Sequence, residues 1–136
     1  MIKIGLDLHG VVDTFPEKFS ELAWAIISGG GEVHIITGLK RDPEIIEQLT
    51  EWNVPFTKYF SIVDYLEEKG VEVEWRANLP YADETEWDKA KADYCDENLI
   101  DFMFDDSFKY GPYFDNIDTT YLQLRNVNRT IYEVRK

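Results

Sequence analysis

The chain has 136 residues, of which 44% are hydrophobic and 15% aromatic, so it can bury one compact core and is not a disordered chain. Its formal net charge of −13 opposes binding of nucleic acid or of an anionic membrane. Among nucleic acids, only the end of a chain stays open as a ligand. A single cysteine excludes an internal disulfide, and no apolar run is long enough to cross a bilayer, so we expect a cytoplasmic protein.

Segments with the periodicity of strands alternate along the chain with segments that have the periodicity of helices. Strands are predicted at residues 2–8, 32–38, 71–75, 100–107 and 119–124, with a further strand or a tail at 130–134. Helices are predicted from Pro16 to Ile27, from Asp42 onward, over 61–69 and over about 85–98. Segment 71–75 is expected near a sheet edge, and 77–85 is expected to be a loop that carries Pro80.

This alternation of strands and helices implies right-handed βαβ units. We therefore predict an α/β fold with a mainly parallel sheet and helices on both faces, formed by one domain over residues 1–136. Ligands of such sheets bind at the carboxyl ends of the strands. The side chains at the predicted strand ends are therefore the candidates for a functional site.

Carboxylates follow two of the predicted strands at this edge. The first strand ends at Asp7, His9 and Asp13, and a late strand ends at Asp105 and Asp106. Bringing carboxylates together costs repulsion and desolvation unless a cation neutralises them. Such oxygen ligands suit Mg²⁺, which commonly binds through one or two carboxylates plus a phosphate oxygen. For Asp13 two roles stay open, lining the site or capping the helix that follows, and we favour the cap.

Groups suited to a phosphoryl group come from the second predicted strand and from a later helix. The second strand ends at Thr37 and Gly38, a hydroxyl and a residue that permits close approach. On the helix over 85–98, Lys91 lies on the apolar stripe that faces the sheet, whereas Lys89 lies on a polar face. We therefore predict Lys91 as the phosphate-binding cation, with Lys89 as the alternative.

The segments "DLHGVVD", "IITG" and "FMFDDS", with a helix lysine before the last of them, occur in the order of the four motifs of the haloacid dehalogenase-like superfamily. The chain resembles this superfamily over residues 4–107. The resemblance implies a Rossmann-like sheet in which the first strand is central and the "FMFDDS" strand lies beside it. It also implies Mg²⁺-dependent hydrolysis of a phosphate monoester through an aspartyl-phosphate intermediate.

The resemblance also assigns a role to each matching residue. Asp7 would be the nucleophile that attacks phosphorus in line. Mg²⁺ would be held by the Asp7 carboxylate, the backbone carbonyl of His9 and the Asp106 carboxylate, with Asp105 supporting its water shell. The phosphoryl oxygens would be held by Thr37 and Lys91. Catalysis of this type is largely positioning and charge neutralisation.

The spacing of the motifs bears on how the site is covered. Members of the superfamily that carry a cap domain insert it after the first motif or between the second and third. Only a helix-sized segment follows the first motif, and residues 39–85 hold about two helices and an edge strand, so we expect no separate cap domain. The rim is expected from loops 75–85 and 108–118, which bring aromatic side chains that could stack on a ring: Trp75, Tyr81, Tyr110 and Tyr113.

Position 9 departs from the family pattern, because phosphatases of the superfamily normally have a second aspartate there. That aspartate protonates the leaving oxygen and then activates the hydrolytic water. Histidine is competent for the same work, since it is a common acid–base catalyst. Three outcomes stay open: hydrolysis with His9 as acid and base, slow turnover of phosphorylated Asp7, or binding of metal and phosphate without catalysis. We predict the first.

A receiver domain of the signalling type is a less favoured alternative. It uses the same kinds of residue, but it has the acidic pair after the first strand and the phosphorylated aspartate in mid-chain. Here the order is reversed, because Asp7 comes first and the acidic pair comes late. We expect a small phosphorylated molecule as the substrate and leave a homo-oligomer open. His34, inside the second predicted strand, is interpreted as structural.

Overall fold

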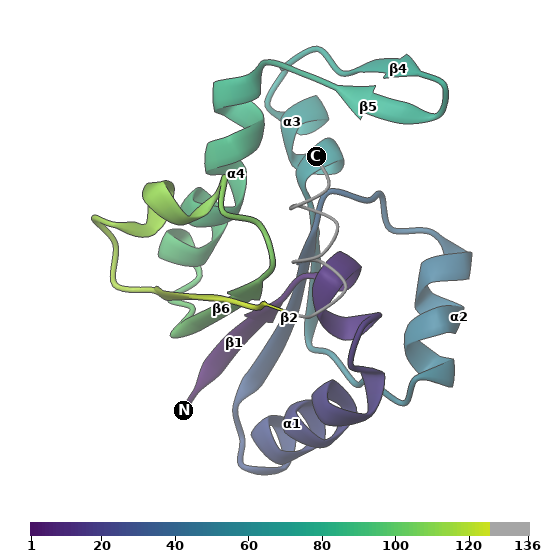
Figure 1. Cartoon of the computed structure of the whole chain (residues 1–136), viewed down its shortest axis with the longest axis vertical. Helices are drawn as coiled ribbons and strands as arrows, with labels where there is room; N and C mark the ends of the chain where they lie inside the picture. Colours follow the sequence, from purple (N-terminus) through teal and green to yellow (C-terminus); the bar gives the residue numbers. More distant parts are fainter. Residues whose placement is uncertain (126–136) are drawn as a thin grey trace.

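The computed structural model describes residues 1–125, which form an α/β fold around a five-stranded parallel sheet (Figure 1). The strand order is β3-β2-β1-β6-β7, and each neighbouring pair is parallel. The strands are β1 (Lys3–Leu6), β2 (Glu32–Thr37), β3 (Lys58–Ser61), β6 (Phe102–Asp105) and β7 (Thr120–Gln123). The predicted Rossmann-like architecture is confirmed, with β1 central and β6 beside it.

Within residues 1–125, four α-helices cover the two faces of the sheet. They are α1 (Pro16–Ser28), α2 (Pro43–Glu51), α3 (Ile62–Glu68) and α4 (Glu84–Glu97). Residues of α1 and α2 pack into one apolar core and residues of α3 and α4 into the other, so the sheet is buried on both faces. A short turn, η1 (Leu8–Val12), follows β1, and a second one, η2 (Gly111–Phe114), precedes β7.

Side-chain caps explain where three of these helices begin. The carboxylate of Asp42 accepts a hydrogen bond from the Ile45 backbone N–H at the start of α2. Asp83 caps α4 in the same way, and the Ser61 hydroxyl caps α3. Each cap satisfies a backbone donor that has no partner inside the helix, which fixes the starting residue.

Two predictions about the segment between α3 and α4 are wrong. The sequence predicts a strand near the sheet edge over residues 71–75, but β4 (Glu74–Arg76) pairs antiparallel with β5 (Leu79–Tyr81) in a separate two-stranded hairpin. The expected loop over 77–85 therefore contains β5, including Pro80. The hairpin forms because Ala77 and Asn78 both have positive φ, at 49° and 65°, which turns the chain tightly between the two strands.

The hairpin lies beyond the main sheet, at the same end of the molecule as the carboxyl ends of β1 and β2 (Figure 1). Strand β3 has no counterpart among the predicted elements. The segment 130–134 lies outside the described residues. No helix within residues 1–125 combines the length and the apolar character needed to cross a membrane.

The side chain of His34 is fully buried in β2 and has a polar partner at each ring nitrogen. Its Nδ1 lies 2.7 Å from the Tyr94 hydroxyl, and its Nε2 lies 2.7 Å from Glu32 Oε1. Burial lowers the pKa of His34, because charging the ring inside the protein costs solvation, and this outweighs the opposing effect of Glu32. A neutral ring satisfies both contacts when Nε2–H donates to Glu32 and Tyr94 donates to Nδ1.

Because the pKa of His34 is lowered by folding, the unfolded chain binds a proton more readily, and its ring charges below about pH 6.5. The contribution of neutral His34 to the free energy of unfolding is therefore fully present above about pH 6.5 and decreases as the pH falls below that value. We expect the melting temperature of the wild type to fall more steeply than that of His34→Gln between about pH 7.5 and 5.5. Circular dichroism melts at several pH values measure this difference.

The control for this prediction is His9→Gln, which removes the other histidine of the chain and keeps the buried one. We expect this variant to retain the steep pH dependence of the wild type. Parallel curves for the wild type and His34→Gln would contradict the prediction.

Candidate functional site

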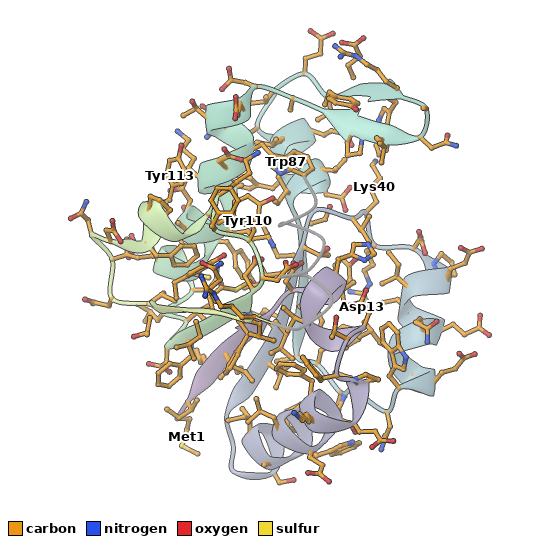
Figure 2. All side chains as sticks on the ribbon, viewed as in Figure 1. Met1, Asp13, Lys40, Trp87, Tyr110 and Tyr113 are labelled. Carbon is orange, nitrogen blue, oxygen red and sulfur yellow. The ribbon has the colours of Figure 1, made fainter. Side chains whose placement is uncertain are left out.

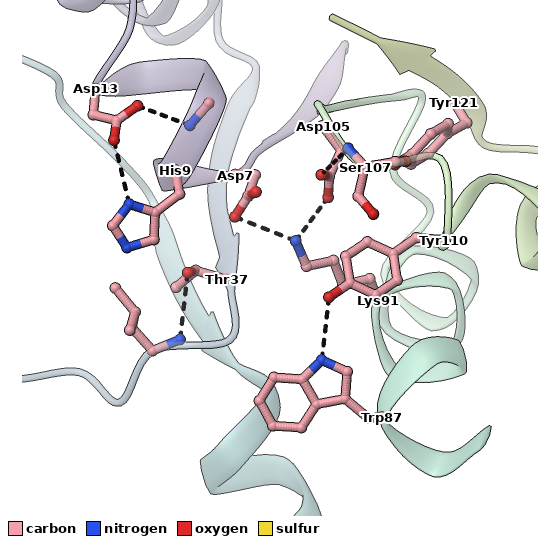
Figure 3. Close-up of polar contacts among 12 residues, drawn as sticks. Asp7, His9, Asp13, Thr37, Trp87, Lys91, Asp105, Ser107, Tyr110 and Tyr121 are labelled. Carbon is pink, nitrogen blue, oxygen red and sulfur yellow. Dashed lines mark hydrogen bonds and ion pairs between the residues drawn. The ribbon is translucent and has the colours of Figure 1, made fainter. Parts of the chain in front are cut away.

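A cavity of about 450 Å³ opens at the carboxyl ends of β1, β2 and β6. The side chains predicted for the site come from three strand ends and one helix, and they line this cavity together (Figure 3). They are Asp7, His9, Thr37, Gly38, Lys91, Asp105 and Asp106. Lys89, the alternative lysine, lies outside the cavity and is ion-paired with Glu86.

The ammonium group of Lys91 lies between two carboxylates at the floor of this cavity. Its Nζ is 3.2 Å from Asp7 Oδ1 and 2.7 Å from Asp105 Oδ2. The lysine is only 2% exposed and Asp105 is fully buried, so water screens this cluster very little. The Asp7 backbone N–H donates to the Phe104 carbonyl, which fixes the end of β1 against β6.

The protonation of these groups follows from their burial and from their neighbours. Burial raises the pKa of Asp7 to about 7, with Asp105 adding to the rise and Lys91 opposing it. Burial alone favours a neutral amine at Lys91, but the attraction of Asp7 and Asp105 outweighs it and raises the pKa of Lys91. Burial therefore outweighs the attraction of Lys91 at Asp7, and this carboxyl group takes up a proton more readily than an exposed aspartate does.

Asp106 adds a third carboxylate to this group. One oxygen each of Asp7, Asp105 and Asp106 lies within 4.8 Å of the others. The Asp106 carboxylate also lies against the backbone of Gly10, where a Cβ would overlap it, and Gly10 has a positive φ of 80°. Three convergent hard oxygen donors with a single cation among them are a chemically suitable donor set for a divalent cation such as Mg²⁺.

We expect millimolar Mg²⁺ to raise the melting temperature of the wild type, since an ion that binds only the folded state stabilises it. The variant Asp106→Asn should lose most of this shift, because it removes one anionic donor and leaves the Asp7–Lys91–Asp105 contacts in place. Thermal denaturation with and without Mg²⁺ measures the effect. The control Asp13→Asn, outside the carboxylate cluster, should keep the shift, and an unchanged shift in Asp106→Asn would contradict the assignment.

Thr37 and Gly38 lie at the end of β2, on the side of the cavity opposite β6. The Thr37 hydroxyl oxygen accepts a hydrogen bond from the Leu39 backbone N–H at 3.3 Å, which orients this oxygen in the turn. Gly38 lies against the indole of Trp87, where a Cβ would be 2.9 Å from Cζ2. A side chain at position 38 would therefore displace Trp87.

His9 and Asp13 form a pair at the mouth of the cavity. His9 Nδ1 lies 3.2 Å from Asp13 Oδ2, and the other Asp13 oxygen accepts from the Gly10 backbone N–H at 2.8 Å (Figure 3). The prediction that Asp13 caps the following helix is wrong, because α1 begins after Phe15 without a side-chain cap. Asp13 instead closes the turn that follows β1, because its carboxylate accepts from the backbone N–H of Gly10, three residues earlier in the chain.

The aromatic rim was predicted only in part. Tyr81 and Tyr110 line the cavity, but Trp75 and Tyr113 do not. Figure 2 labels Tyr110 beside Trp87 and Tyr113 apart from them. Trp87, which is not among the residues predicted for the rim, is also part of the cavity wall. The spacing of four residues between Trp87 and Lys91 on one helix is the signal that could have identified it.

Replacing Lys91 by Met tests how strongly the cluster depends on its cation. The variant leaves Asp7 and Asp105 buried together without compensation, so we expect a loss of about 3–5 kcal/mol in the free energy of unfolding. Lys89→Met, in the same helix, removes a partly exposed pair with Glu86 and should cost less than about 1 kcal/mol. Urea denaturation of both variants measures the difference, and similar losses would contradict this prediction.

Comparison with known proteins supports the fold. No family model matches the chain. No curated protein gives a significant match. A solved structure of an uncharacterized protein from Corynebacterium glutamicum is similar, with a TM-score of 0.56 and 19% sequence identity over 98% of this chain and 92% of that chain. At this identity the similarity concerns the α/β fold alone.

Proposed function

We propose that the protein is a Mg²⁺-dependent phosphohydrolase of the haloacid dehalogenase-like type, which cleaves a phosphate monoester through an aspartyl-phosphate at Asp7. The observation that supports it most is the cluster in which Lys91 bridges Asp7 and Asp105 beside Asp106. This arrangement unites a nucleophile, a buried cation and a hard donor set at one strand edge. Structural ion pairs alone do not require the third carboxylate or the cavity above it.

In the first step, an Asp7 carboxylate oxygen attacks phosphorus, and the bond from phosphorus to the leaving oxygen breaks. An ammonium group has three N–H donors, so Lys91 can donate to a phosphoryl oxygen as well as to Asp7 and Asp105. The Thr37 hydroxyl accepts from Leu39, so its own proton is available for a second phosphoryl oxygen. Both donors then stabilise the charge on the transferring group.

Mg²⁺, held by Asp7, Asp106 and the His9 carbonyl, would neutralise the phosphate charge and keep Asp7 ionised despite its burial. Asp105 fits a supporting role, because one of its oxygens accepts from the Ser107 N–H at 3.1 Å and the other faces Lys91. The raised pKa of Asp7 makes a nearby cation necessary, since only the ionised carboxylate is a nucleophile.

His9 is the proposed acid and base. It gives a proton to the leaving alkoxide, then takes one from the water that attacks the phosphorus of phospho-Asp7, which releases inorganic phosphate and restores the carboxylate. When Nδ1–H donates to Asp13, Nε2 is the nitrogen that exchanges protons. Asp13 thereby acts as a positioning residue for the ring.

One observation favours a second candidate function, which is formation of phosphorylated Asp7 that turns over only slowly. The His9 side chain is 74% exposed and turned toward Asp13, so its ring meets the leaving oxygen only if it moves or the substrate reaches the mouth of the cavity. In that case the site would accept a phosphoryl group at Asp7 and release it slowly.

The two functions differ in how the rate depends on the leaving group. We expect wild-type protein with Mg²⁺ to hydrolyse both p-nitrophenyl phosphate and a primary alkyl phosphate, and Asp7→Asn to hydrolyse neither. For His9→Ala we expect a loss of about 100-fold or more on the alkyl phosphate, whose alkoxide needs a proton. The loss on p-nitrophenyl phosphate should be smaller, because its leaving group departs as an anion.

Measured phosphate release gives these rates, with EDTA as the control for the metal. Equal and negligible rates for the wild type and both variants across several phosphate esters would overturn the enzyme proposal. Release of alcohol in a single burst, followed by a stable phosphorylated protein, would instead support the slow-turnover alternative.

A further inference from the structure

The cavity above Asp7 has two chemically different parts. Its floor is charged and polar, with the carboxylates, Lys91 and Thr37. The rest of its lining is mostly apolar or aromatic. We call the following five residues the apolar wall: Leu79, Pro80, Tyr81, Trp87 and Tyr110. A phosphoryl group accounts for the floor but not for this wall.

One side of the apolar wall is held rigidly. Trp87 Nε1 donates to the Tyr110 hydroxyl at 3.1 Å, which ties α4 to the segment after β6 (Figure 3). The Trp87 indole is also in contact with Gly38, and the Tyr110 ring lies 4.8 Å from the Lys91 ammonium. Both rings therefore have fixed positions before any ligand arrives, so binding against them costs little side-chain entropy.

The other side of the apolar wall comes from the β4–β5 hairpin. Leu79 and Tyr81 are 56% and 44% exposed, although both line the cavity. The Arg76 guanidinium lies 4.7 Å from the centre of the Tyr81 ring and supports it from the hairpin itself. Large apolar side chains left exposed beside a polar site gain free energy when a ligand with an apolar surface covers them.

The charges around the cavity indicate which apolar ligands fit. Among the described residues that line it, Lys91 is the one lysine or arginine, and it already contacts two carboxylates. Further cations lie on adjoining segments. Lys40 is paired with Glu67 at 2.9 Å and Arg76 with Glu74 at 3.0 Å, while the Arg41 guanidinium lies over the Phe56 and Tyr59 rings, outside the cavity lining. A second anionic group on the substrate would therefore lack a partner in a protein with net charge −13.

We infer that the apolar wall is a binding site for a flat, uncharged ring in the part of the substrate that leaves, so that the substrate class is the phosphate monoesters of ring-bearing alcohols. This inference rests on the proposed function for the phosphoryl end of the site. The ring inserts between the hairpin and the Trp87–Tyr110 pair while the phosphate reaches Asp7. Bisphosphates and esters with a carboxylate on the ring are disfavoured by charge.

Three primary alkyl phosphates test the inference, because similar leaving alcohols keep the chemical step comparable. We expect kcat/KM for 2-phenylethyl phosphate to exceed that for ethyl phosphate by about 10- to 100-fold, the gain from burying a phenyl ring. A carboxylate in the para position of the same ring should abolish most of that gain.

The variant Tyr81→Ala should lower the preference for 2-phenylethyl over ethyl phosphate by about three- to tenfold, the size of one aromatic contact. Tyr81→Phe retains the ring and should retain the preference. The matched control is Tyr113→Ala, since Tyr113 is an exposed tyrosine that does not line the cavity. An unchanged preference in Tyr81→Ala would overturn the role of the hairpin.

Binding of phosphonates, which cannot be hydrolysed, separates this inference from the proposed function. Calorimetry of the wild type with Mg²⁺ should show tighter binding of 2-phenylethylphosphonate than of ethylphosphonate. Tighter binding without hydrolysis of any ester would overturn the phosphohydrolase and support the ring site. Equal affinities would overturn the ring site, and hydrolysis of the esters would then still support the phosphohydrolase. Binding of neither phosphonate together with hydrolysis of none of the esters would overturn both.

Discussion

The rest of the site depends on the ion pairs that the buried ammonium group of Lys91 forms with two carboxylates. Lys91 extends from α4, and its partners Asp7 and Asp105 lie at the ends of β1 and β6, so one side chain connects three elements. A buried ion pair adds little net stability, because desolvation offsets most of the attraction. Its effect is geometric: the pair fixes where the Asp7 carboxylate lies and leaves the acidic cluster short of positive charge.

That shortage of positive charge connects the site to the surface around it. The protein has 27 acidic and 14 basic residues, and Lys40, Lys69 and Arg76 are each paired with a neighbouring carboxylate. We therefore expect the cavity to bind a phosphate more tightly when a cation is bound beside it, because the charges of the two ligands compensate each other. In the proposed function, the apolar wall would distinguish substrates by shape and hydrophobicity, because the surrounding field disfavours any additional negative charge.

The sequence predicted the elements that have strong local signals. Helices that begin at Pro16 and after Asp42, and buried strands such as Glu32–Thr37, follow from periodicity and caps. Strand β3 has only four residues and gains its stability from pairing with β2, which no local pattern reveals. The hairpin depends on positive φ at Ala77, which is uncommon for alanine. The position of Asp13 depends on the turn at Gly10, a matter of backbone geometry rather than of spacing.

The place of β1 in the middle of the sheet also has a consequence for the order in which the protein can fold. Its partner β6 arrives late in the chain, and the hydrogen bond from Lys3 to Asp101 joins residues 98 positions apart. During synthesis the first strand therefore has one unpaired edge, and Asp7 has no lysine, until α4 and β6 have left the ribosome. Pairings over such distances slow folding and leave the early strand open to wrong partners in the meantime.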